Sequence, residues 1–198
     1  CARVCIKVEN RRGQFAEGWG ETPLSVQWVW PGGLSYELRE DALKRFCKRI
    51  EEYLPKLPEY GHPMELGYLF QENILPKFLE EFNQENQFGE PMPYLAGLVC
   101  FSAFDIAIHD AYGNVNQVPV YNTYNEEYMN RDLEYYLEPV KELTDVFSGK
   151  YPEDYFKKPA GKELVAWHLV GGKDVLRDDG TVKRPDDGYP FTLDEWIE

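Results

Sequence analysis

This sequence of 198 residues lacks paired cysteine motifs, glycosylation sequons and apolar runs long enough to cross a membrane. Its four cysteines, Cys1, Cys5, Cys47 and Cys100, form no CxxC pair and no framework typical of a disulfide-rich or zinc-binding domain. We therefore expect free, buried thiols in a reducing compartment, and a cytoplasmic protein. The sequence also contains no Asn-x-Ser/Thr sequon, targeting signal, internal repeat or low-complexity tract.

Positive charge is scarce, and the net charge is -14. This acidity excludes nucleic acid and anionic membrane surfaces as partners, because both would repel the chain. The longest apolar run, residues 95–108, contains Asp105 and is too short to span a bilayer, so we interpret it as a buried helix. With 43% hydrophobic and 28% charged residues, the composition is that of a soluble globular protein.

The first residues alternate with a period of two and predict a β-hairpin. Val4, Ile6 and Val8 share one face of the first strand, and a second strand, FAEGWGE, follows the turn sequence RRGQ. We expect Trp19 to pack in the core face of this hairpin. The stretch GWGETPLSVQWVWPGG (18–33), which holds three of the five tryptophans, then has the prolines and glycines of a loop.

Helical periodicity dominates the middle of the chain. Ser35 is the expected N-cap of a helix that ends at Pro55, and its apolar stripe comprises Leu38, Ala42, Leu43, Phe46, Ile50 and Leu54. A second helical region, 64–86, should break or kink at Pro76. A third helix opens at Pro93, is apolar on nearly every side and closes at Gly113. We further expect an extended segment at 118–121 and a polar, aromatic helix over 131–147.

The last fifty residues predict a linker followed by a second, shorter part of the chain. A linker over 151–162 separates residues 1–150 from residues 163–198, where ELVAWHLVGG (163–172) predicts a buried strand. Thr192 and Glu195 form the capping-box signature of a helix start. A helix this short does not offset its nucleation cost, so we expect the chain to be a fragment of a longer protein.

Two segments resemble the amino-terminal domain of the enolase superfamily, in its mandelate racemase and muconate lactonizing enzyme branch. The first is the hairpin RRGQFAEGWGETPL. The second, SAFDIAIHDAYGNVNQVPVY, is similar to the A-x-D-x-A-x-x-D-x-x-G helix of that domain, carried here by Ala103, Asp105, Ala107, Asp110, Gly113, Pro119 and Val120. The chain departs from the family at Asn114, where a basic residue is usual, and by an insertion over about 122–150.

The resemblance implies a fold and an activity. The fold is an α+β capping domain, an antiparallel sheet followed by a helical bundle, and then the truncated beginning of a β/α barrel. The activity is Mg²⁺-dependent abstraction of the proton α to a carboxylate, as in an acid-sugar dehydratase or a racemase/epimerase. The substrate is then a small carboxylate such as a sugar acid, and the full-length protein a homo-oligomer. The base and the three acidic metal ligands are implied on later barrel strands, so no catalytic residue and no metal ligand is expected within this fragment.

Specificity is implied to reside in the loop that follows GWGE. In this interpretation Glu21, Thr22, Gln27, Trp28 and Trp30 cover the distal end of the substrate and exclude water. For Trp28 and Trp30, packing between cap and barrel is an equal alternative. His168 and Lys173 lie near the end of the predicted barrel strand and are candidates for the barrel mouth.

Other interpretations of the same residues stay open. Asp105 and His109, one helical turn apart, could share a hydrogen bond or a metal, but we favour buried carboxylates at Asp105 and Asp110 that accept hydrogen bonds within the cap. For the whole chain, the alternatives are a stand-alone α+β ligand-binding module whose tryptophans grip a sugar ring, and a non-catalytic relative of the family.

Overall fold

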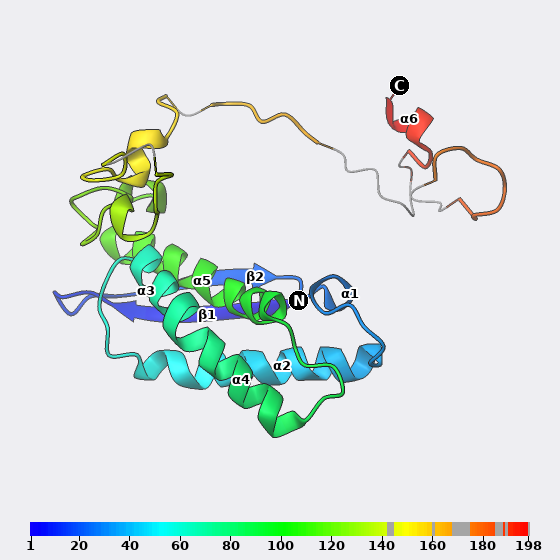
Figure 1. Cartoon of the computed structure of the whole chain (residues 1–198). Helices are drawn as coiled ribbons and strands as arrows, with labels where there is room; N and C mark the ends of the chain where they lie inside the picture. Colours follow the sequence, from blue (N-terminus) through cyan, green and yellow to red (C-terminus); the bar gives the residue numbers. More distant parts are fainter. Residues whose placement is uncertain (142–144, 160, 168–174, 185–187, 189, 198) are drawn as a thin grey trace. The chain divides into compact units, whose positions relative to one another are not determined.

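The computed structural model describes residues 1–141, 145–159, 161–167, 175–184, 188 and 190–197. The chain divides into two compact units, Cys1–Phe156 and Lys157–Glu198. The first unit is an α+β domain, in which a two-stranded antiparallel sheet is followed by helices (Figure 1). The α+β class expected from the sequence is therefore confirmed for this unit.

The predicted hairpin is present, and its strands alternate as expected. Strand β1 (Ala2–Glu9) pairs antiparallel with β2 (Phe15–Thr22), with Cys5 opposite Trp19. Asn10 shapes the turn, since its Oδ1 accepts hydrogen bonds from the backbone amides of Arg12 and Gln14 at 2.9 and 3.1 Å. Val4, Ile6 and Val8 are half-buried and the residues between them are exposed, so the inward face of β1 is confirmed.

The core face of β2 is the face opposite Trp19. Gly18 and Gly20 are buried, whereas the Trp19 side chain is 57% exposed, so the expectation that Trp19 packs in the core is wrong. The reason is the close approach of the long helix α5 (Tyr94–Asn116) to this strand. A Cβ on Gly20 would lie 2.0 Å from the carbonyl oxygen of Ala103, and one on Gly18 would lie 2.1 Å from the amide nitrogen of Ala111. Only glycine fits at these two positions.

Hydrogen bonds also hold β2 close to α5. The backbone amide of Trp19 donates to Asp110 Oδ2 on α5 at 2.8 Å, and Asn114 Nδ2 donates to the carbonyl oxygen of Glu17 at 2.9 Å. Asp110 therefore accepts a backbone hydrogen bond within the domain, as expected, but the expectation that it is buried is wrong, because Asp110 is exposed. Asn114, at the position where the family has a basic residue, joins the end of α5 to the hairpin.

Helix α2 (Tyr36–Tyr53) follows the sequence prediction closely. Its N-cap is Ser35, whose hydroxyl accepts from the amide of Leu38 at 3.2 Å. Four of the six residues predicted for its apolar stripe, Ala42, Leu43, Phe46 and Ile50, are fully buried. The other two differ: Leu38 is exposed, and Leu54 is half-buried in a 3-10 turn, Leu54–Lys56, that ends the helix.

The break expected at Pro76 is confirmed as a change of helix type. Helix α3 (Pro63–Leu69) continues into a π-helical turn, Phe70–Ile74, and then into α4 (Leu75–Asn86). Pro76 has no amide to donate into the preceding turn, and its ring crowds that turn, which favours the wider π geometry. The π-helical turn places Phe70 in the core, stacked on Phe101 of α5 with ring centroids 4.1 Å apart.

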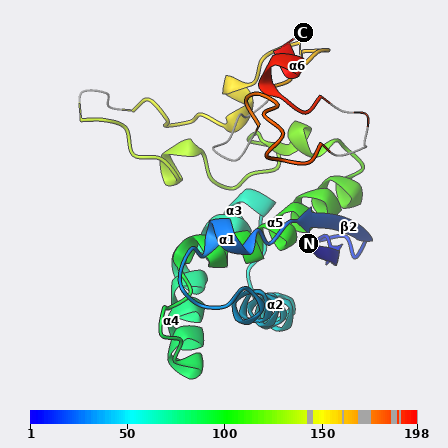
Figure 2. The ribbon, with the colours of Figure 1, turned by 90° about the vertical axis from the view of Figure 1, so that its right-hand side faces the viewer.

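Helix α5 is the central element of the first unit, and Figure 2 shows it from a direction in which α2 is seen nearly end-on. It contacts β1, β2, α2, α3 and α4. By length and composition α5 is long enough to cross a membrane, contrary to our estimate from residues 95–108, but half of its most apolar window is buried inside the domain. It ends at Asn116 rather than Gly113, because Gln117 adopts the left-handed conformation (φ 59°) that closes the helix.

The insertion is a packed part of the first unit. The extended segment expected at 118–121 and the helix expected over 131–147 are both wrong for the described residues, which form short 3-10 turns at Val120–Thr123, Leu133–Tyr135 and Pro152–Tyr155. Backbone hydrogen bonds join Leu133 to Lys150 at 2.7 Å and Glu153 to Tyr124 at 3.1 Å. The unit boundary at Phe156 falls within the predicted linker.

The second unit contains one described helix, α6 (Leu193–Ile197). Thr192 caps it as predicted, with its hydroxyl accepting from the amide of Glu195 at 3.3 Å. The predicted barrel strand is described only at 163–167, where no strand is assigned and the Trp167 side chain is 92% exposed. The buried strand predicted over 163–172 is therefore wrong for the described residues 163–167, which are all exposed, and the beginning of a barrel stays a prediction.

The tight contact between β2 and α5 yields a stability prediction. Replacing Gly20 with alanine forces the added methyl group against the Ala103 carbonyl, and overpacking against backbone costs about 3 kcal/mol or more. Chemical denaturation of Gly20→Ala should show this loss. Gly89→Ala is the matched control, because a Cβ there meets nothing within 4 Å. Equal stability of the two variants would contradict the proposed packing.

Candidate functional site

The loop predicted to act as a substrate lid is anchored to the core. Residues 21–33 include a short helix, α1 (Val26–Val29), and four of their apolar side chains are buried: Leu24, Val26, Val29 and Trp30. At the far end, the amide of Gly33 donates to both carboxylate oxygens of Glu90 at 3.0 Å. The loop is thus held from several sides by buried side chains and hydrogen bonds.

Trp30 is a core residue, so its assignment to the substrate site is wrong. The side chain is only 2% exposed, and its ring meets Phe88 edge-on with centroids 5.4 Å apart. Its carbonyl oxygen accepts a hydrogen bond from the buried guanidinium of Arg39. Among the described residues, the indole Nε1 has no hydrogen-bond partner. Trp30 therefore fixes the loop and does not face a ligand.

The other four residues predicted in the loop divide into two pairs. Glu21 forms an ion pair with Arg3 across the hairpin at 2.7 Å, and Thr22 accepts a hydrogen bond from the Ser102 hydroxyl at 2.9 Å. Gln27 is exposed, and the Trp28 side chain is 67% exposed on a helix whose other face is buried. Gln27 and Trp28 are the part of the predicted specificity loop that is free to meet a substrate.

The predicted barrel-mouth residues cannot be compared with the loop. His168 and Lys173 lie outside the described residues. Among the residues that the structure does describe, no group of three or more His, Cys, Asp or Glu side chains could hold a metal ion.

Asp105 and His109 are partly exposed and lie at the edge of a cluster that is centred on the buried His62. His109 Nδ1 lies 2.8 Å from the carbonyl oxygen of Asp105 and 3.7 Å from its carboxylate. Burial raises the pKa of Asp105. The His62 ring lies 6.3 Å from the His109 ring, with Tyr112 and Tyr124 at 5.0 and 4.9 Å. No sequence pattern indicated His62, because histidine is not among the preferred N-cap residues.

His62 joins two segments, the start of α3 and the 3-10 turn Val120–Thr123, while it is neutral. It caps α3, with Nδ1 accepting from the amide of Met64 at 3.1 Å, so the ring proton resides on Nε2. Nε2 donates to the Thr123 hydroxyl at 2.9 Å, and this hydroxyl donates to the carbonyl oxygen of Val120 at 2.6 Å. Burial, with a smaller contribution from His109, lowers the pKa of His62 to about 4. The arrangement is structural, since every polar atom of the ring has a partner.

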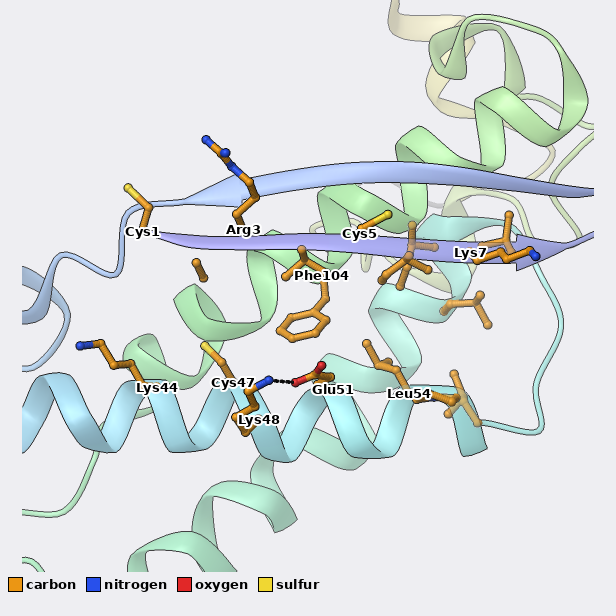
Figure 3. Close-up of a pocket in the computed structure, with 18 of the residues that line it drawn as sticks. Cys1, Arg3, Cys5, Lys7, Lys44, Cys47, Lys48, Glu51, Leu54 and Phe104 are labelled. Atoms are coloured by element: carbon orange, nitrogen blue, oxygen red, sulfur yellow. Dashed lines mark hydrogen bonds and ion pairs between the residues drawn. The ribbon is translucent and has the colours of Figure 1, made fainter.

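A groove that the sequence did not predict lies between β1 and α2 (Figure 3). Its volume is about 710 Å³. Helix α5 contributes Ile108 and Phe104, of which Phe104 lies between strand and helix. Helix α2 contributes Lys44, Cys47, Lys48 and Glu51. Two of the four cysteines expected to be buried, Cys1 and Cys5, are exposed and line this groove. Cys47, which also lines it, is half-buried, and Cys100 is buried. The signal for such a groove is indirect: a sheet of two strands cannot cover the helices beneath it.

Comparisons with known proteins identify no relative. No protein-family model, no curated protein and no solved structure matches the chain. The assignment of a function therefore rests on the residues themselves and on the resemblance of their motifs.

Trp28, which is exposed, and Trp30, which is buried, should respond differently to replacement by alanine. Trp30→Ala removes a fully buried indole and is expected to lower the free energy of unfolding by about 3–5 kcal/mol. Trp28→Ala should change it by no more than about 0.5 kcal/mol, because the side chain is exposed. Guanidinium denaturation measures both. Similar losses in the two variants would contradict the anchored loop.

The state of His62 predicts a dependence of stability on pH. Its pKa is lower in the folded chain, about 4, than the ordinary value of 6.5, so its stabilising contribution is complete above pH 6.5 and is lost as the pH falls toward 4. The loss should be on the order of 3 kcal/mol.

His62→Gln is the comparison for this prediction, since glutamine offers a donor and an acceptor but does not titrate in this range. Denaturation at pH 7 and pH 4 should show a larger acid loss in the natural chain than in the variant. Parallel losses would show that other groups cause the acid sensitivity.

Proposed function

We propose that the chain is the capping domain and the beginning of the barrel of a Mg²⁺-dependent enzyme of the enolase superfamily. The enzyme abstracts the proton α to the carboxylate of a small acid such as a sugar acid, as a dehydratase or a racemase/epimerase. Residues 1–156 close the active site and contribute to substrate specificity, and residues 163–198 begin the barrel.

The observation that carries this proposal is the contact between the two segments that resemble the family. Gly18 and Gly20 of GWGE pack on the backbone of α5 at Ala103, Ala107 and Ala111. Trp19 donates its amide to Asp110, the second acidic position of the helix motif. Two motifs separated by about eighty residues thus form one structural unit. This contact between the two motifs supports the proposal that the first unit has the fold of the family's capping domain. The proposed activity is inferred from the resemblance alone.

The residues described here do not provide a Mg²⁺ site, because no group of three possible ligands occurs among them. We place the acidic ligands and the catalytic base on barrel strands that would follow residue 198. No step of the reaction is therefore assigned to this chain. Its own contribution is to shape and close the site.

Within the cap, Gln27 and Trp28 are the residues proposed to meet the substrate. The buried neighbours Val26, Val29 and Trp30 hold the backbone in place, so the indole of Trp28 is presented on a rigid support. A positioned aromatic side chain at the rim of a closed site excludes water and packs on an apolar substrate face. The amide of Gln27 can both donate and accept a hydrogen bond.

One observation favours a second candidate, a ligand-binding module without catalysis. The first unit has its own packed core, and the Trp28 side chain is exposed on it. Exposed tryptophans on rigid loops suit the faces of sugar rings. Saturable quenching of tryptophan fluorescence by sugars, with no chemical change of the sugar, would support this candidate.

The proposed activity is tested on the polypeptide encoded by the complete reading frame that contains residues 1–198. It should incorporate deuterium from heavy water at the α carbon of one of a panel of sugar acids, in a reaction that requires Mg²⁺ and is followed by proton NMR. A reading frame without a Lys or His base and three acidic residues on later strands, together with no exchange, would refute the proposal.

In this enzyme, Trp28→Ala should raise KM or lower kcat by about tenfold, the effect of losing one aromatic contact, with little change in melting temperature. Tyr60→Ala is the control, because Tyr60 is an exposed aromatic residue outside the loop. Unchanged kinetics of Trp28→Ala would remove Trp28 from the substrate site without refuting the activity.

A further inference from the structure

Cys47 and Cys100 are in direct contact where helix α2 packs on α5. Cys100 Sγ donates a weak hydrogen bond to the carbonyl oxygen of Leu43 at 3.6 Å, and Cys47 Sγ donates one to the carbonyl oxygen of Cys100 at 3.9 Å. Within an α-helix, the carbonyl of Leu43 also accepts the amide of Cys47. Each sulfur therefore lies against the backbone of the other residue's helical turn. A disulfide joins only residues in such close contact, with Cα atoms about 4.4–6.8 Å apart.

The other two cysteines are too far apart to form the same bond with each other. Cys1 and Cys5 are exposed and lie four positions apart, with the extended chain of β1 between them. Four extended residues span roughly 13 Å, about twice the Cα separation that a disulfide allows. Within the folded chain, we therefore look to Cys47 and Cys100 for thiol chemistry that involves a pair.

The two thiols of this pair differ in their access to solvent. Cys47 is half-buried and lines the groove of about 710 Å³, and Figure 3 shows it on the side of α2 that borders this groove. Cys100 is fully buried. A small oxidant that enters the groove from solution therefore meets Cys47 first.

The contact between the thiols also separates their acidities. A hydrogen bond with the Cys100 thiol lowers the pKa of Cys47, although burial opposes this effect. The same hydrogen bond, together with burial, raises the pKa of Cys100. The thiolate is the reactive form of cysteine, so the accessible member of the pair is also the stronger nucleophile. Cys100 keeps its proton and can donate it to the sulfur of Cys47.

We propose that Cys47 and Cys100 are a peroxide-sensitive thiol pair, which is converted reversibly into a disulfide between α2 and α5. The thiolate of Cys47 attacks one oxygen of hydrogen peroxide and the O–O bond breaks, which gives a sulfenic acid at Cys47 and a hydroxide ion that takes up the proton released by the thiol. The sulfur of Cys100 then attacks the sulfur of Cys47. The S–S bond forms, the S–O bond breaks, and the hydroxide leaves as water with the proton of Cys100.

The overall reaction oxidises the two thiols by two electrons and reduces the peroxide to two molecules of water. The bridge connects positions 53 apart in the sequence and fixes α2 on α5. It also engages the one sulfur of the pair that lines the groove. Disulfides in a reducing compartment are usually transient and sense the redox state, which suits a bond of this kind. This site does not depend on the activity proposed above.

The test uses the chain of residues 1–198 with Cys1→Ser and Cys5→Ser, which removes the two exposed thiols. The folded chain is treated with hydrogen peroxide, and its mass is measured without reductant. We expect the single chain to lose the mass of two hydrogen atoms and both of its titratable thiols, and dithiothreitol to restore them. The oxidised chain should melt about 5 °C or more above the reduced chain, because the bridge restricts the unfolded state.

Serine variants in the same background separate the roles of the two thiols. Serine keeps a donor for the carbonyl oxygen that each thiol contacts. In Cys100→Ser, peroxide should leave a sulfenic acid on Cys47 that dimedone traps. In Cys47→Ser, labelling of the buried Cys100 should be at least about tenfold lower. Circular dichroism checks the fold of both variants. If one does not fold, the mass change and the melting temperature of the parent chain still decide.

Several results would overturn the proposal. The first is a chain that keeps both thiols after peroxide treatment, and the second is a disulfide that forms only between two chains. Equal labelling of the two serine variants by dimedone would contradict the order of attack. A lower melting temperature of the oxidised chain would show that the bridge distorts the packing of α2 on α5. Equal rates of bridge formation in the folded chain and in urea would show that the fold does not position the pair.

Discussion

The first unit depends on the contact between two backbones, that of β2 and that of α5. Helices usually pack on sheets through side chains, at a separation of about 10 Å, but here alternate residues of the strand are glycines and the facing helix positions are alanines. The hairpin settles on the helix closely enough for the amide of Trp19 to reach Asp110. This contact decides which face of β2 is buried, and so it explains why the large side chains of that strand, Phe15 and Trp19, are exposed.

Sequence patterns predicted those elements in which local chemistry and burial agree. The Ser35 cap, the core of the α2 stripe, the alternation of β1 and the Thr192 cap all depend on spacing within one segment. The prediction for Trp19 failed because large apolar residues are normally buried, whereas the partner that reverses this rule, α5, is some ninety residues away. The helix predicted over 131–147 failed because its residues are held by Lys150 and Glu65, which lie outside the segment.

The candidate sites, too, were predictable from the sequence only where they depend on neighbouring residues. The sequence located the tryptophan loop but not the division between Trp28, which is exposed, and Trp30, two residues later, which is anchored by Phe88 and Arg39. The groove beside β1 could not be located, since it exists only where β1, α2, α3 and α5, which are distant in sequence, leave space between them. His62 was missed because its burial results from the packing of Tyr112, Thr123 and Tyr124 around it.

Hydrogen bonds of Glu65 attach the insertion to α3, and this attachment bears on how long the insertion can be. Its carboxylate accepts hydrogen bonds from the amides of His62, Asn130 and Arg131 at 2.6–3.0 Å, so the insertion is attached to the first turn of α3 at residues 130 and 131. The bond between Leu133 and Lys150 then closes the chain on itself. Doubling the length of such a closed loop costs only about 0.6 kcal/mol. The chain between Leu133 and Lys150 could therefore be lengthened at little cost in stability, while the helices and the hairpin keep their arrangement.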